Sequence, residues 1–271
     1  MTAGATATAG HAAEAAGGGP LRTPDPPARS GFGSESAERG GQVLVEGTSF
    51  VVSRPGGDIE GEGEGLFVRD ARIVSRWRLL IDGEPIDPLG GFTTEPFAGV
   101  FVARSRVRDG HLEPTLLVER RRYVGAGMRE DLVLRNYGGE PAGVAVVVEI
   151  AADFADLFAV KLGKPAGDEP VTVTVDAEEW SAATRHGQSA RAVHVRAAGA
   201  AATPDGLSFR VVVAPHGEWR TSLGVFAEVD GAELPMRFPL DSPPERATPV
   251  RRSSSGSGAS RPCAPGRSRS A

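Results

Sequence analysis

The segment LLVERRRYVGAGMREDLVLRNYGGEPAGVAVVVEI, residues 116–150, decides the fold class of this chain. Apolar and β-branched residues recur through 116–124 and 128–136, and the Gly-Ala-Gly tripeptide at 125–127 favours a hairpin between the two runs. A Gly-Gly-Glu-Pro turn then leads into 142–150, a run so rich in valine that we expect it in the centre of a sheet. The segment therefore predicts two paired antiparallel strands followed by a central strand.

The same alternation of short apolar runs and turns continues on both sides of this segment. Gly, Pro, Asp and Asn separate the runs, and Asp82-Gly83 is a strong hairpin signal because both residues tolerate a positive φ. Residues 151–162 allow a turn or two of helix at most. The pattern predicts an all-β protein, an antiparallel β-sandwich. The further expected strands are 43–53 as two runs around Gly47-Thr48, 66–68, 73–81, 92–108, 171–175, 192–196, 207–213 and 219–229.

The two ends of the 271-residue chain differ in composition from its middle. Residues 1–41 are mostly Ala, Gly, Pro, Thr and Ser, and Ser, Pro and Arg dominate 241–271. Neither end carries enough apolar surface to offset the entropy of ordering it, so we expect both to be disordered low-complexity tails. The remaining part, 42–240, is long enough for one sizeable β-rich domain with its own core.

Charge and cysteine content exclude several classes of protein. The formal net charge of −5 argues against general nucleic-acid binding. The basic C-terminal tail is compatible with contact to RNA or an anionic membrane, but we interpret it as a solvated tail. The single cysteine, Cys263, leaves no disulfide framework, no apolar run is long enough to span a bilayer, and a signal peptide is absent. We therefore expect a soluble, cytoplasmic protein without nucleic-acid or membrane partners.

The acidic segment GGDIEGEGEG, residues 56–65, has the glycine content of a phosphate-binding loop. It lacks the Lys-Ser/Thr pair of such loops, no helical pattern follows it, and its four acids would repel phosphate. Calcium binding is the other possibility, but the ligand spacing of an EF-hand is absent. We therefore interpret the segment as a flexible hairpin connection.

Asp153 and Asp156 are the best candidate pair of carboxylates in the sequence. Glycoside hydrolysis needs two acids on opposite sides of the glycosidic bond, whereas two acids three residues apart on one turn face the same way. We expect them instead to accept backbone N–H bonds at a tight turn, or to pair with arginines of the run 120–122.

The arginine run 120–122 lies within an expected strand. Side chains alternate between the two faces of a strand, so Arg120 and Arg122 share one face and Arg121 points to the other. Glu130 and Asp131 on the facing strand offer cross-strand partners. We therefore expect ion pairs here rather than an anion-binding site.

Histidine and tryptophan residues complete the search for a site. The histidines do not fall at metal-ligand spacing, no cysteine accompanies them, and no Gly-x-Ser-x-Gly elbow is present. Sugars stack on exposed tryptophan rings, but a tryptophan within a β pattern favours a place in the core. The residues by themselves therefore predict a β domain without an active site. The residues considered are His11, His111, His186, His194, His216, Trp77, Trp180 and Trp219.

Several motifs occur in the order and spacing of a known family. From Val43 to Val229 the chain resembles the N-terminal domain of bacterial glycogen-debranching enzymes of the amylo-α-1,6-glucosidase type. Each motif is weak alone, and their order makes the resemblance specific. The motifs are GTSFVVS (47–53), GDI (57–59), GLFVRDAR (65–72), LLIDGEPI (79–86), RRRY (120–123), DLVLRNY (131–137) and DFADLFAVK (153–161).

The resemblance implies a β-sandwich of the super-sandwich type that packs against an (α/α)₆-barrel, and the barrel carries the catalytic acids. It implies no catalytic residue, no metal and no cofactor in this domain. Two positions depart from the family pattern: Ala71 replaces a threonine and Ala159 replaces a glutamate. The loss of this glutamate weakens the polar network expected at the turn. The motif residues expected to be structural or adjacent to a ligand are Asp70, Arg72, Arg120, Arg122, Asn136, Asp153 and Asp156.

No barrel fits after residue 240, and the Arg/Pro/Ser/Gly/Ala bias of 241–271 is what out-of-frame reading of a GC-rich gene gives. We expect a truncated or frameshifted relative without hydrolase activity of its own, which packs against or supports an α-glucan-processing barrel. The face that meets the barrel would be a bare apolar patch and make the isolated chain prone to associate. Two alternatives stay open: a stand-alone α-glucan (glycogen)-binding module, and a glycoside hydrolase that uses Asp153 or Asp156.

Overall fold

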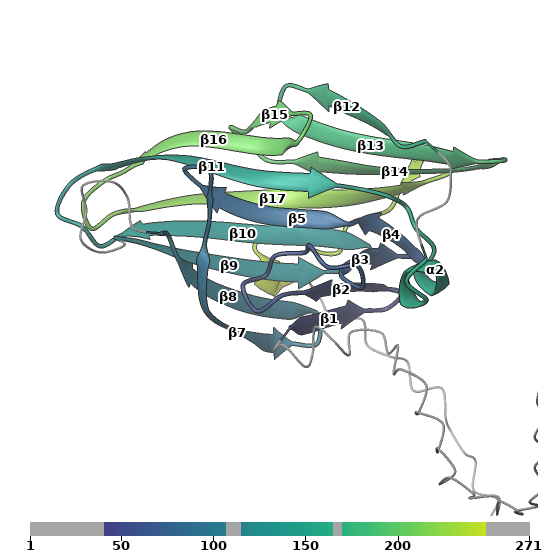
Figure 1. Ribbon diagram of the computed structural model, residues 1–271, viewed down its shortest axis with the longest axis horizontal. Coiled ribbons are helices and arrows are strands. Elements are labelled where there is room, and N and C mark those ends of the chain that lie inside the picture. Colours follow the sequence, from purple (N-terminus) through teal and green to yellow (C-terminus); the bar gives the residue numbers. More distant parts are fainter. Residues whose placement is uncertain (1–40, 107–114, 165–169, 248–271) are drawn as a thin grey trace, which may run out of the picture.

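The computed structural model describes residues 41–106, 115–164 and 170–247. Within these ranges nearly all regular structure is β-strand, arranged in three antiparallel sheets (Figure 1). A nine-stranded sheet forms one layer, and strands of a five-stranded and a four-stranded sheet pack against it. The all-β sandwich predicted from the sequence is confirmed.

The nine-stranded sheet combines strands from the middle and the end of the domain. In order of pairing its strands are β12 (Thr172–Asp176), β13 (Glu179–His186), β14 (Ser189–Arg196), β17 (Glu218–Val229), β10 (Gly127–Asn136), β9 (Leu116–Val124), β8 (Ala98–Arg104) and β7 (Asp87–Glu95), with β18 (Ala232–Glu233) paired to β17.

The two smaller sheets make up the opposite layer. The five-stranded sheet has the order β15 (Ala201–Thr203), β16 (Gly206–Val213), β11 (Ala142–Ala151), β5 (Arg76–Ile81) and β6 (Glu84–Pro85). The four-stranded sheet has the order β1 (Gln42–Glu46), β2 (Ser49–Ser53), β3 (Gly65–Val68) and β4 (Ala71–Val74). The described helices are α2 (Leu157–Lys161) and the 3₁₀ turn η1 (Pro244–Arg246).

The strands predicted from 116–150 form as expected. β9 and β10 pair across a tight turn in which Ala126 has a φ of 54°, and β11 lies between β16 and β5. Alternate residues of β11 are buried, because one of its faces lies on the opposite sheet. The predicted hairpin at Asp82-Gly83 is also confirmed, with φ values of 55° and 81°.

Two of the predicted strand runs need correction. The run 73–81 is divided at Ser75 into β4 and β5, which belong to different sheets. The run 92–108 contains parts of two strands, because the chain turns at Pro96-Phe97 between β7 and β8, and residues 107–108 lie outside the described part. The strands β6, β13, β15 and β18 lie outside the expected runs. The single short helix α2 agrees with the turn or two of helix expected at 151–162.

One hydrophobic core joins the three sheets. Trp77 on β5 and Trp180 on β13 are fully buried in it, and Trp219 on β17 packs edge-on against Phe209 at a centroid distance of 5.3 Å. The prediction that the tryptophans serve the core is therefore confirmed for these positions, and they are not exposed stacking platforms.

The segment after β18 lies on the nine-stranded sheet. Phe238 packs between Phe97 and Tyr123, with centroid distances of 5.4 Å to each ring. Arg129 donates hydrogen bonds of 2.6 Å to the carbonyls of Pro239 and Ser242. The described chain thus continues past residue 240 to 247, into the tail predicted for 241–271. Residues 1–40 of the predicted tail 1–41 and residues 248–271 lie outside the described residues.

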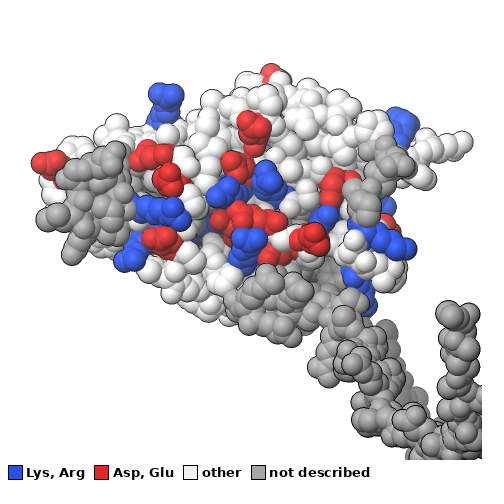
Figure 2. Space-filling model, in the orientation of Figure 1, with Lys and Arg blue, Asp and Glu red and all other residues white. Residues whose placement is uncertain are grey.

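The described ranges contain no helix with the length and apolar character needed to cross a bilayer. Acidic and basic side chains mix on the face shown in Figure 2. The partly exposed ion pairs of the domain include Arg54–Glu60 at 2.5 Å and Arg78–Glu60 at 2.8 Å. This face therefore does not present a field of one sign, in keeping with the mild net charge.

Candidate functional site

Two motif segments far apart in the sequence meet at one end of the sandwich. Asp70 lies in the turn between β3 and β4, Arg72 lies on β4, and the segment between β11 and α2 carries Asp153 and Asp156. The amide of Leu157 donates to the Asp70 carbonyl, and the amide of Arg72 donates to the Ala155 carbonyl, both at 2.9 Å. Backbone hydrogen bonds thus hold the two motifs together.

Arg72 and Asp153 form the central ion pair of this junction. The guanidinium of Arg72 engages both carboxylate oxygens of Asp153, with Nε at 3.1 Å from Oδ1 and Nη2 on Oδ2. Its Nη1 donates to the carbonyls of Glu62 and Glu64 at 2.6 and 3.2 Å. The expected pairing of Asp153 with arginines of 120–122 is therefore wrong, because Arg72 lies next to it and occupies both of its oxygens.

Asp156 caps the helix α2. Its Oδ1 accepts a 2.8 Å hydrogen bond from the amide of Phe158, which otherwise has no partner within the helix. Asp153 Oδ1 likewise accepts from the amide of Ala155 at 3.3 Å. The expectation that these carboxylates accept backbone N–H bonds at a tight turn is confirmed.

The backbone on both sides of the junction has an uncommon conformation. Arg69, Asp70 and Phe154 have φ values of 48°, 63° and 51°, in the left-handed region that non-glycine residues rarely occupy. Such conformations persist only where the surrounding contacts impose them, and they concentrate at functional sites. Here the ion pair and the two backbone hydrogen bonds supply those contacts.

A hollow of about 550 Å³ opens beside this junction, and we call it the α2 pocket. Its walls come from three places in the sequence: the β3–β4 turn, the segment 153–164, and the end of the β13–β14 hairpin. Its volume lies within the usual range of small-molecule sites. The lining residues are Asp70, Ala71, Asp153, Phe154, Ala155, Asp156, Ala159, Lys164, Thr184, His186, Ser189 and Arg191.

A second polar cluster lies inside the sandwich, between β9, β10 and the loop before β3. Arg120 and Arg122 are completely buried on the same face of β9, as the alternation predicted, and both pair with the buried Glu130. Arg120 Nε lies 3.0 Å from Glu130 Oε1, and Arg122 Nη2 lies 2.5 Å from Glu130 Oε2. The indole N–H of Trp77 also donates to Glu130, at 3.0 Å.

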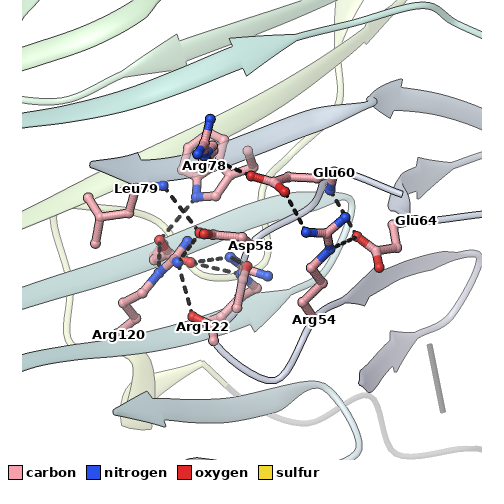
Figure 3. Close-up of polar contacts among 12 residues, drawn as sticks. Arg54, Asp58, Glu60, Glu64, Arg78, Leu79, Arg120 and Arg122 are labelled. Carbon is pink, nitrogen blue, oxygen red and sulfur yellow. Dashed lines mark hydrogen bonds and ion pairs between the residues drawn. The ribbon is translucent and has the colours of Figure 1, made fainter. Parts of the chain in front are cut away.

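The acidic glycine loop contacts this arginine cluster through Asp58 (Figure 3). Asp58 accepts from Arg120 Nη1 at 2.5 Å, and the carbonyls of Gly56 and Gly57 accept from Arg120 and Arg122 at 3.1 and 2.6 Å. The loop does connect two paired strands, β2 and β3, as predicted. It is nevertheless anchored by the buried guanidiniums, so the interpretation as a flexible connection is wrong.

The charges of the cluster shift the pKa values of its members. Burial acts to raise the pKa of Glu130, but the guanidiniums of Arg120 and Arg122 outweigh this and hold the pKa below its usual value. Burial lowers the pKa of Arg122, which shares its carboxylate with Arg120. The ion pairing that the sequence predicted for this strand is confirmed for Glu130, whereas Asp131 pairs with Arg129 instead.

Because of the buried Glu130 in the arginine cluster, we predict that the folded protein loses stability in acid. A carboxylate whose pKa is lower in the folded state stabilises the fold above its unfolded pKa, near 4.5, and this contribution disappears as the pH falls through the folded pKa. We expect the free energy of unfolding, measured with urea from pH 7 to pH 3, to fall below about pH 4.5. Glu119→Gln should retain most of this dependence of the unfolding free energy on pH, because Glu130 is unchanged. A free energy of unfolding that stays constant from pH 7 to pH 3 would contradict the prediction.

Asn136 stabilises the turn after β10 and lies away from the α2 pocket. Its Nδ2 donates to the carbonyls of Glu140 and Val213 at 2.7 and 3.2 Å, and its Oδ1 accepts from the amide of Gly138 at 2.9 Å. The seven residues marked by the motifs therefore divide into three groups. Asp70, Arg72, Asp153 and Asp156 lie at the α2 junction, Arg120 and Arg122 in the arginine cluster, and Asn136 at a turn.

The sequence did not indicate the far wall of the pocket. His186 and Arg191 come from the β13–β14 hairpin, whose first strand was not predicted. The alternation through 179–186 followed by a Gly-Gln turn was the available signal.

His194 was considered only as a metal ligand, yet its two ring nitrogens lie 2.9 and 3.2 Å from the carboxylates of Glu179 and Glu228. The described residues contain no cluster of His, Cys, Asp or Glu that could hold a metal ion.

The fold and the junction define the class of the protein: a two-layer β-sandwich domain with a ligand-sized pocket where two sequence motifs meet. The sequence profile of the N-terminal domain of (some) glycogen debranching enzymes matches residues 44–224, and the chain belongs to this family. The resemblance inferred from the motifs is therefore confirmed. Among curated proteins, no sequence matches the chain.

The following solved structures are distantly similar to the chain. A protein named as a kojibiose phosphorylase from the human microbiome is 7% identical, with a TM-score of 0.43 over 67% of this chain, and the chain spans only 24% of that protein. A protein named as an aldose 1-epimerase from Escherichia coli K12 is 11% identical over 69% of this chain and 98% of its own length, with a TM-score of 0.44. A galactose mutarotase-like protein from Clostridium acetobutylicum is 6% identical over 69% and 94% of the two chains, with a TM-score of 0.38.

Proposed function

We propose that this chain is a non-catalytic domain that packs against an α-glucan-processing catalytic domain and supports it. The family match over 44–224 is the observation that carries this proposal, because the family consists of N-terminal domains of glycogen debranching enzymes. The catalytic acids would then lie in the domain against which this one packs.

The hydrogen bonds and ion pairs of the candidate carboxylates support a non-catalytic role. Both oxygens of Asp153 are occupied by Arg72, and Asp156 caps α2. Glu130 is buried between two arginines. A glycoside hydrolase needs one acid that protonates the leaving group and a second carboxylate across the bond. Asp153, Asp156 and Glu130 have structural partners instead.

An apolar edge provides the surface for packing. Leu89 and Phe92 on β7 are more than half exposed, and Val43 and Val45 on the neighbouring strand β1 are nearly as exposed. β7 is also the last strand of its sheet and carries almost no buried residue. Exposed edge strands with apolar side chains favour association with another chain or domain. We assign this β1–β7 edge to the contact with the catalytic domain.

Co-elution tests the proposal directly. The chain should form a complex on gel filtration with the separately produced catalytic domain of a glycogen debranching enzyme, and it should release no glucose from branched limit dextrin by itself. Replacing Leu89 and Phe92 by serine should weaken the complex at least about tenfold, because apolar burial is lost. Val212→Ser, at an even more exposed apolar position on β16, is the control and should leave the complex unchanged.

Two outcomes would contradict this proposal. Glucose release by the purified chain, abolished in Asp156→Asn, would favour a hydrolase. Retardation in a glycogen gel without any complex with the catalytic domain would favour the second candidate, a stand-alone α-glucan-binding module.

A further inference from the structure

The α2 pocket contains polar groups that the fold does not use. Among the described residues, the carboxylate of Asp70 and the ammonium of Lys164 have no hydrogen-bond or ion-pair partner, and Asp156 uses only Oδ1. The hydroxyl of Thr184 donates to the carbonyl of Pro170 and can still accept. The pocket therefore offers both acceptors and donors to a ligand, from three separate segments of the chain.

Among the described residues, the lining of the pocket carries the carboxylates of Asp70, Asp153 and Asp156 and the cations of Lys164 and Arg191. Arg72 does not line the pocket but pairs with Asp153, so two carboxylates and two cations remain. A phosphate would meet the remaining carboxylates, and a metal cation would meet the remaining positive charges. A neutral ligand avoids both of these charge repulsions. Hydroxyl groups are neutral groups that both donate and accept hydrogen bonds.

The walls between these polar groups are apolar and fixed in position. Phe154, Ala155 and Ala159 line the pocket, and Phe154 is held in the left-handed conformation by the Arg72–Asp153 junction. A pocket with apolar walls and a few oriented polar groups is typical of small-molecule sites. The backbone that presents Asp70 and Phe154 is thus set before a ligand binds.

We propose that the α2 pocket binds a neutral saccharide. Asp70 and Asp156 accept hydrogen bonds from its hydroxyl groups, Lys164 donates to them, and the face of the sugar lies on Phe154 and Ala159. The identity of this saccharide as the end of an α-glucan rests on the proposed function, whereas the saccharide class itself rests on the charge balance and the unpaired groups.

Calorimetric titration of the full chain with maltotriose tests this site. The wild-type chain should show saturable binding. Ala159→Phe, which fills the pocket, and Lys164→Gln, which removes the donor, should each weaken binding at least about tenfold. Leu162→Phe and Lys161→Gln are matched controls on the same segment, since neither residue lines the pocket, and they should bind within about twofold of wild type. Circular dichroism and thermal melting show that each variant is folded.

The outcomes separate this inference from the proposed function. Binding of cellotriose but not maltotriose would keep the saccharide pocket and count against α-glucan processing. No saturable binding of either sugar, binding unaffected by Ala159→Phe, or preferential binding of inorganic phosphate would overturn the pocket assignment. None of these three results would affect the complex with the catalytic domain.

Discussion

Replacing Glu130 by alanine is expected to lower the free energy of unfolding by about 3–5 kcal/mol, the usual cost of removing one partner from a buried ion pair. The substitution leaves the guanidiniums of Arg120 and Arg122 buried without their shared carboxylate. It also removes the acceptor of the Trp77 indole N–H. Urea denaturation at pH 7 measures the loss, and loosening of the 54–64 loop should accompany it as faster proteolysis.

Glu119→Ala is the matched control for this experiment. Glu119 lies on the same β9–β10 pair but points to the outer face, where it pairs with Arg121 and Arg135 at 2.6 and 2.8 Å. Partly exposed ion pairs contribute little, so the control should lose less than about 1 kcal/mol. Equal losses in the two variants would show that burial of the cluster does not determine its contribution.

The second large effect is expected at Gly206, the first residue of β16. Its φ of 140° favours glycine, and a Cβ atom there would lie 2.0 Å from the Val148 carbonyl oxygen on the neighbouring strand. Gly206→Ala therefore forces β16 away from β11, which breaks the pairing between the two strands. We expect a loss of about 3 kcal/mol or more in the free energy of unfolding.

Gly143→Ala tests whether this effect comes from the position rather than from the type of substitution. Gly143 lies on β11, the partner strand of β16, and a Cβ atom there meets nothing within 4 Å. Its substitution should be neutral or slightly stabilising, because alanine reduces the entropy of the unfolded chain. A similar loss in both variants, measured by thermal melting, would contradict the clash at Gly206.

Local sequence patterns predicted much of the fold. The β9–β10 hairpin, the central place of β11 and the Asp82-Gly83 turn follow from side-chain alternation and turn residues within short windows. The burial of Arg120 and Arg122 with Arg121 outside follows from the same two-residue period. These features depend on neighbours in the sequence, so the sequence shows them directly.

The incorrect predictions from the sequence have a common cause. The division of 73–81 at Ser75 and the anchoring of the acidic loop depend on which sheet or side chain lies opposite, not on the residues themselves. The partner of Asp153 was expected on β9 but is Arg72, 81 residues away in sequence. The β13–β14 wall of the α2 pocket likewise depends on contacts between distant segments. Period and turn signals carry no information on such contacts.

The sequence by itself determined the β-sandwich, the family and the two faces of the arginine strand, because periodicity and motif order are properties of the chain read in one dimension. Only the tertiary structure decided that Asp70, Asp153 and Lys164 share one pocket and that Asp58 of the acidic loop pairs with Arg120. The physical reason is that packing two sheets face to face fixes distances between residues that no local rule connects.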